Sequence, residues 1–131
     1  MIEEIIEAIE TNDRKMLYFT SNRVIVASIG GRVLSATFGL LGALAEAQMR
    51  AKKKEQLQKL TPESILTADK SNFALPYNEV GTIEISKKML GRKVRIISGT
   101  QKHEFWMAKP KEYEEYVNIL RPVLGDKLVV S

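Results

Sequence analysis

Cysteine is absent from the 131 residues, and histidine occurs once. Without cysteine the fold has no disulfide, no thiolate zinc site and no thiol nucleophile. The single histidine, His103, precedes Glu104 in a segment with strand character, so the two side chains are expected on opposite faces and cannot form a catalytic dyad. With no second histidine to complete an ordinary metal site, neither a metal nor a cofactor is expected. These scarcities predict a protein that is not an enzyme.

Apolar runs long enough to cross a membrane are also lacking. Thirteen residues from Val33 to Ala45 carry no charge, whereas a spanning helix needs about 20. The sequence starts with Glu3 and Glu4 close behind the first methionine, where a secretory signal would carry basic residues. We therefore expect a cytoplasmic protein, and association with the surface of a membrane stays open.

The composition is that of an ordinary folded domain, with 44% hydrophobic and 27% charged residues. One domain over residues 1–131 is expected. The net charge of +4 is concentrated in residues 50–60, where five cations face one carboxylate, Glu55. Since the rest of the chain is neutral overall, the diffuse basic surface of a typical nucleic-acid binder is missing.

Short strands dominate the pattern. Residues 15–20 and 23–29 are rich in aromatic and β-branched side chains and flank the turn pair Ser21-Asn22, which predicts a hairpin. Further strands are expected at residues 73–77, 81–86, 94–98 and 102–107, whereas residues 2–10 are compatible with a strand or a helix.

Three helices are predicted between and after these strands. Residues 37–60 are rich in Ala, Leu, Gln and Lys, which are strong helix formers. Thr61 is placed to cap a short second helix that begins at Pro62 and runs to about Ala68. Residues 110–120 form an amphipathic helix that Pro122 or Gly125 stops. The expected class is α+β, mainly β: a small antiparallel barrel or orthogonal sandwich with a C-terminal helix and an inserted helix.

Three segments resemble the pleckstrin-homology-like domains of prokaryotes, which are similar to GRAM domains. They are "YFTSNRVIVAS" (18–28), "FALPYNEVGTIEI" (73–85) and "KPKEYEEYVNILRPVL" (109–124). The resemblance implies a strand at residues 4–10 and a final helix that plugs the barrel. The helical insertion at 37–60 departs from the family pattern, so the specific role of this protein is expected to reside there.

The inserted helix is apolar on nearly all sides over residues 38–45, which is too much apolar surface to leave in water. Packing on its own domain needs only one apolar stripe. We therefore expect an interaction module that forms a homo-oligomer or docks a partner protein through this helix. The predicted contact residues are Phe38, Leu40, Leu41, Leu44 and Met49.

Two other partners remain open for the same region. As the first alternative, residues 38–54 lie in the interface of an anionic membrane, with the basic half of the helix on the lipid head groups. As a weaker alternative, the basic residues bind nucleic acid. The cations concerned are Arg50, Lys52, Lys53, Lys54 and Lys59.

A second basic group surrounds the sequence Met89-Leu90-Gly91, the expected tip of a hairpin. Such charges ordinarily solubilise a loop and protect strand edges, but an apolar tip flanked by cations also suits an anionic membrane surface. The basic residues around the tip are Lys87, Lys88, Arg92, Lys93 and Arg95.

Further along, Phe105 and Trp106 alternate across a strand, so one is expected to face the core and the other to face outward.

Overall fold

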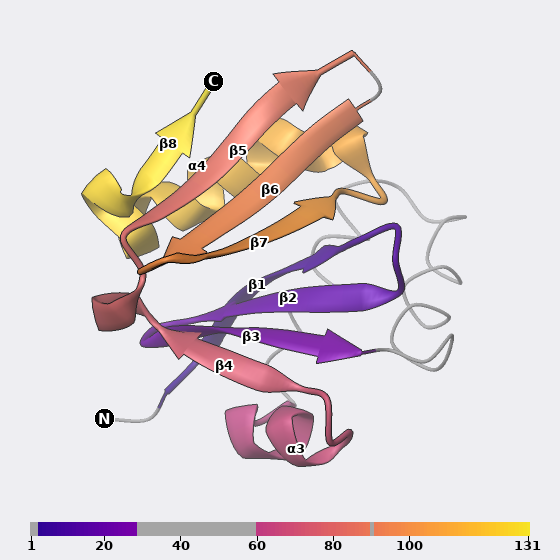
Figure 1. The fold of residues 1–131 in the computed structure, drawn as a ribbon, viewed down its shortest axis with the longest axis vertical. Coiled ribbons are helices and arrows are strands. Elements are labelled where there is room, and N and C mark those ends of the chain that lie inside the picture. The colour runs from indigo at the N-terminus through magenta and orange to yellow at the C-terminus, as the bar shows by residue number, and fades with distance from the viewer. Residues whose placement is uncertain (1–2, 29–59, 90) are drawn as a thin grey trace.

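The computed structural model describes residues 3–28, 60–89 and 91–131, and within them eight strands form two four-stranded sheets. Figure 1 shows the second sheet lying over the first. The first sheet has the order β1 (Ile5–Glu10), β2 (Lys15–Thr20), β3 (Arg23–Ser28), β4 (Phe73–Pro76). The second has the order β7 (Gln101–Trp106), β6 (Gly91–Ser98), β5 (Thr82–Lys88), β8 (Leu128–Val130).

The predicted α+β class is confirmed, in its sandwich form. The two sheets meet at a bridge between Thr11 and Met107, at the ends of β1 and β7, and do not close into a barrel. Of residues 2–10, for which the pattern allowed a strand or a helix, residues 5–10 form strand β1, close to the strand at 4–10 that the family resemblance implies. Strand β8 was not predicted, and it runs parallel to β5, so the second sheet is mixed rather than purely antiparallel.

Two α-helices lie within the described residues. Helix α3 (Pro62–Thr67) starts as predicted, because the Thr61 hydroxyl accepts a hydrogen bond from the Ser64 N–H at 3.1 Å. Helix α4 (Tyr113–Leu124) follows a 3₁₀ turn (Pro110–Glu112) and ends at Gly125, where φ is +55°. The helix predicted at residues 37–60 lies outside the described residues, apart from Leu60.

Pro122 does not stop α4 but sits inside its last turn, so that alternative is wrong. A proline there removes the N–H that would bond to the carbonyl of Asn118. Asn118 lies on the exposed side of the helix, the side on which a missing backbone donor costs least, because water can reach the carbonyl. Gly125, which adopts a positive φ without a Cβ clash, is the residue that ends the helix.

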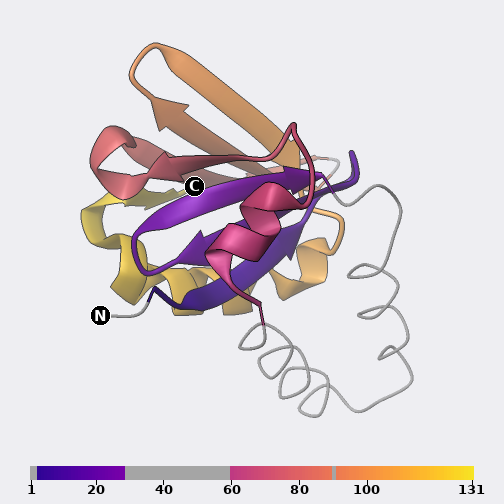
Figure 2. The same cartoon turned by 90° about the horizontal axis from the view of Figure 1, so that it is seen from below.

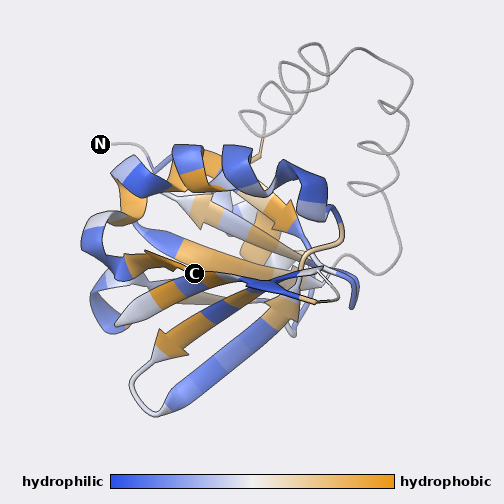
Figure 3. Ribbon diagram, turned by 90° about the horizontal axis from the view of Figure 1, so that it is seen from above, coloured by the Kyte–Doolittle hydropathy of each residue, from blue (hydrophilic) through white to orange (hydrophobic). Residues whose placement is uncertain are grey.

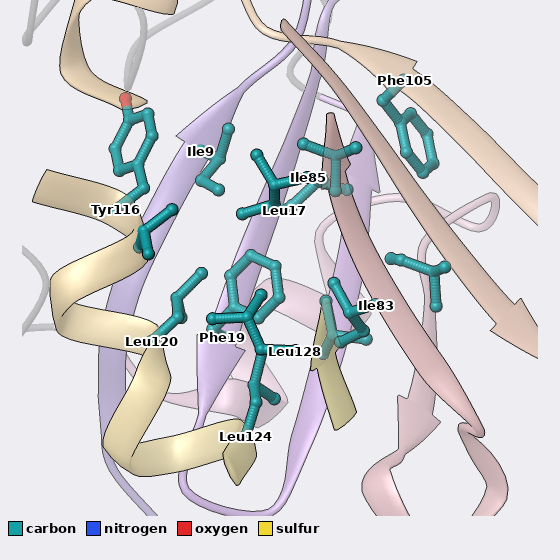
Figure 4. Packing of buried hydrophobic residues seen from close by; sticks show 14 of the residues in the cluster. Ile9, Leu17, Phe19, Ile83, Ile85, Phe105, Tyr116, Leu120, Leu124 and Leu128 are labelled. Atoms are coloured by element: carbon teal, nitrogen blue, oxygen red, sulfur yellow. The ribbon is translucent and has the colours of Figure 1, made fainter. Parts of the chain in front are cut away.

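The main core fills the space between the two sheets and α4. Polar and apolar residues alternate along the helix (Figure 3), and its apolar side chains point toward the sheets (Figure 4). Helix α4 therefore closes one side of the sandwich and buries its apolar stripe, as predicted. The residues labelled in Figure 4 belong to this core: Ile9, Leu17, Phe19, Ile83, Ile85, Phe105, Tyr116, Leu120, Leu124 and Leu128.

The first sheet is buried on its other face as well. There Ile25 of β3 is fully buried, and Ile65 of α3 packs against the same cluster. Figure 2 shows α3 lying across this face. Strands β2 and β3 are thus covered on both sides, which explains their nearly continuous apolar sequences. The buried cluster contains Ile5, Ala8, Met16, Tyr18, Ile25, Ala27 and Ile65.

We predict that Ile25→Ala lowers the free energy of unfolding by about 2–5 kcal/mol, the usual cost of a large-to-small change at a buried site. Urea denaturation followed by circular dichroism measures the change. Val129→Ala on β8, where the side chain is 43% exposed, serves as the control and should cost about 0.5 kcal/mol or less. A loss of only about 0.5 kcal/mol for Ile25→Ala would contradict burial of this face of the first sheet.

Candidate functional site at the tip of the second sheet

Most of the sequence-predicted contact residues lie outside the described residues. This holds for the apolar set Phe38, Leu40, Leu41, Leu44 and Met49 and for the basic set Arg50, Lys52, Lys53, Lys54 and Lys59. The second basic group, around the β5–β6 hairpin, is described and can be examined residue by residue.

The β5–β6 hairpin is longer than the sequence pattern predicts. Its strands pair as far as Lys87 with Arg92 and Lys88 with Gly91, beyond the expected limits at residues 86 and 94. The basic residues therefore stand on regular strands, and the tip is short. Met89 at this tip is 99% exposed. In Figure 1 the hairpin ends at the upper right, away from the β6–β7 turn.

Trp106 lies beside the tip, on the outer face of the second sheet. Its side chain is 38% exposed, whereas Phe105 is buried, so the predicted alternation is confirmed. The indole ring lies next to Gly91, where an added Cβ would come within 3.8 Å of Cε3. The Lys93 ammonium lies 5.8 Å from the ring centroid, close enough for a cation–π interaction. The pattern of residues did not reveal this contact, because it joins two strands.

The outer face below the tip holds a neutral ladder of charges. The Glu104 carboxylate lies 2.6 Å from the Lys93 Nζ and 3.0 Å from the Arg95 Nε. The hydrogen bond from Lys93, with a further one from Arg95, keeps the pKa of Glu104 below its ordinary value. Arg95 also lies 3.9 Å from Glu84. Two cations and two carboxylates thus balance each other.

Lys87 and Lys88 stand outside this neutral ladder and carry positive charge that none of its carboxylates balances. Both side chains are exposed, and in the part of the chain that the structure describes no carboxylate lies within ion-pair distance of either. Arg92, their neighbour across the hairpin, instead stacks over the Tyr113 ring at 4.5 Å. We call Lys87, Lys88, Met89, Lys93 and Trp106 the hairpin tip.

The histidine and the glutamate next to it point away from each other, as predicted. The His103 ring packs against Phe73 of β4, with the centroids 5.3 Å apart, while Glu104 is held by Lys93 and Arg95 on the outer face. Over residues 3–28, 60–89 and 91–131 no three metal-ligating side chains come together. Neither described helix combines the length and the apolar character that crossing a bilayer requires.

Comparison of the sequence with protein-family models and with curated proteins finds no match. The resemblance to pleckstrin-homology-like domains therefore rests on the three sequence segments given above and stays a prediction.

Proposed function

We propose that this chain is a non-enzymatic binding module, built on a pleckstrin-homology-like sandwich, that attaches to an anionic membrane surface through the hairpin tip. The observation that carries the proposal is the almost complete exposure of Met89 directly after Lys87 and Lys88 of β5, which have no ion-pair partner among the described residues. A single exposed apolar side chain is ordinary on a protein surface, so we infer the contact from the combination of Met89 with two neighbouring lysines and the partly exposed Trp106. This observation supports membrane contact, which the sequence raised as the alternative to partner docking, and we assign the contact to the hairpin tip and not to residues 38–54.

The residue types at the tip match the layers of a membrane surface. Methionine is apolar and flexible, so it suits the boundary of the acyl chains. Tryptophan prefers the interface, where its ring meets both apolar and polar surroundings. Lysine near an anionic surface gains about 1 kcal/mol per charge. A folded protein partner would need a pocket that matches the protruding Met89. A bilayer needs no such pocket, because its lipids rearrange around an inserted side chain.

We predict that Met89→Ser weakens binding to vesicles containing about 30% phosphatidylglycerol by about tenfold, since the side chain loses about 1.5 kcal/mol of apolar transfer energy. Co-sedimentation with the vesicles measures the partition. Met89→Leu keeps an apolar tip and should bind like the unchanged chain.

Val129→Ser is the matched control, because it removes an exposed apolar side chain away from the tip. Binding should also fall in about 1 M salt, where the Debye length shrinks to about 3 Å. A chain that ignores anionic vesicles, or a Met89→Ser variant that binds them unchanged, would overturn the proposal.

We further propose, on a separate observation, that residues 37–60 join a second copy of the chain or a partner protein. The supporting observation is the uncharged run at residues 37–45, together with the attachment of both flanks to the first sheet. At one flank the Ser28 N–H donates to the Asn72 Oδ1 at 2.7 Å, and at the other α3 packs on β3. The domain would thus present this segment from a fixed base.

We predict that Leu41→Glu combined with Leu44→Glu reduces the mass in solution to that of one chain, 14.8 kDa, because two buried charges cannot be accommodated in an apolar contact. Size exclusion with light scattering gives the mass. Gln48→Glu with Gln56→Glu adds the same charge at polar positions and should leave the assembly intact. A single-chain mass for the unchanged protein would refute the second copy as the occupant of this contact.

A further inference from the structure

We propose that the hairpin tip recognises the charge density of an anionic bilayer and does not select one lipid head group. The inference rests on the proposed membrane contact and goes beyond it by naming the ligand class. Selection of a single head group requires several cations that converge on one anion. The register of the β5–β6 hairpin places the two exposed lysines of the tip on opposite faces, so they do not converge.

Lys87 and Lys88 point to opposite sides of the hairpin. They are consecutive residues of β5, and side chains alternate between the two faces of a strand. Lys88 pairs with Gly91, beside which the Trp106 ring lies on the outer face. Lys87 pairs with Arg92, which stacks over Tyr113 of α4 on the other side. The two ammonium groups therefore diverge and cannot grip one phosphate together.

The remaining cations near the tip already have partners. Lys93 is held by Glu104 and lies over Trp106, with its side chain only 20% exposed. Arg92 is held against an aromatic ring, and Arg95 is shared between two carboxylates. These contacts fix the cations that would otherwise be free to form a head-group pocket. The two exposed lysines, Lys87 and Lys88, which lie on opposite faces of the hairpin next to Met89, are left to meet the membrane.

This placement defines how the tip meets the bilayer. With Met89 inserted, Lys87 and Lys88 reach head groups of different lipids on the two sides of the hairpin. Each lysine then responds to the local density of negative charge, whatever chemical group carries it. Binding should follow the surface charge of the vesicle and should not follow the identity of the anionic lipid.

The experiment compares three vesicle preparations of equal surface charge, in which phosphatidylglycerol, phosphatidylserine or a phosphoinositide supplies the negative lipid. The full chain should bind all three within about twofold, since each lysine contributes through charge alone. Soluble inositol trisphosphate added in excess should not release the chain. A preference of tenfold or more for the phosphoinositide, or release by the soluble head group, would overturn the inference.

Single substitutions supply an independent readout. Lys87→Gln and Lys88→Gln should each weaken binding about fivefold, and the double variant about 25-fold, because independent contacts add. Lys102→Gln removes an exposed lysine near the β6–β7 turn and should have little effect. Loss of all binding in one single variant would indicate a convergent site and contradict the inference. Absence of vesicle binding by the unchanged chain would instead remove the membrane proposal itself.

Discussion

The burial of the first sheet on both faces is the constraint on which the rest of the structure depends. Strands β2 and β3 pack against the second sheet on one side and against the cluster around Ile25 and Ile65 on the other. They are the two inner strands of the first sheet and their apolar side chains are buried, so they offer a partner no apolar surface. Among the described residues, the exposed side chains that could contact a partner therefore lie mainly on the second sheet, the helices and the turns.

On the second sheet, charge is distributed unevenly. The ladder of Glu84, Arg95, Glu104 and Lys93 is balanced and holds the outer face in one arrangement. The unbalanced charge lies at the tip, next to an exposed methionine. A rigid base with a soft, cationic and apolar end is a suitable shape for contact with a surface, and it needs neither a cavity nor a catalytic group. The proposed membrane attachment follows from this division between a fixed face and a free end.

Local chemistry determined how much could be predicted from the sequence. The cap at Thr61, the turn at Ser21-Asn22 and the stop at Gly125 each depend on a few adjacent residues, and these predictions are confirmed. Strand β8 was not predicted, because its three residues form a strand only by pairing with β5, more than forty positions away. The unbroken apolar runs of β2 and β3 did carry a signal for burial on two faces. The contact between Trp106 and Gly91 could not be predicted from the sequence pattern, since it depends on the register between two strands.

Fluorescence of Trp106, the single tryptophan of the chain, tests most directly whether the hairpin tip enters a membrane interface. When the protein binds anionic vesicles, we expect a shift of the emission to shorter wavelength and quenching by brominated lipids, because the partly exposed indole of the tip moves from water into the head-group layer. An emission spectrum that stays unchanged on vesicles that nevertheless carry the protein would show that another surface makes the contact.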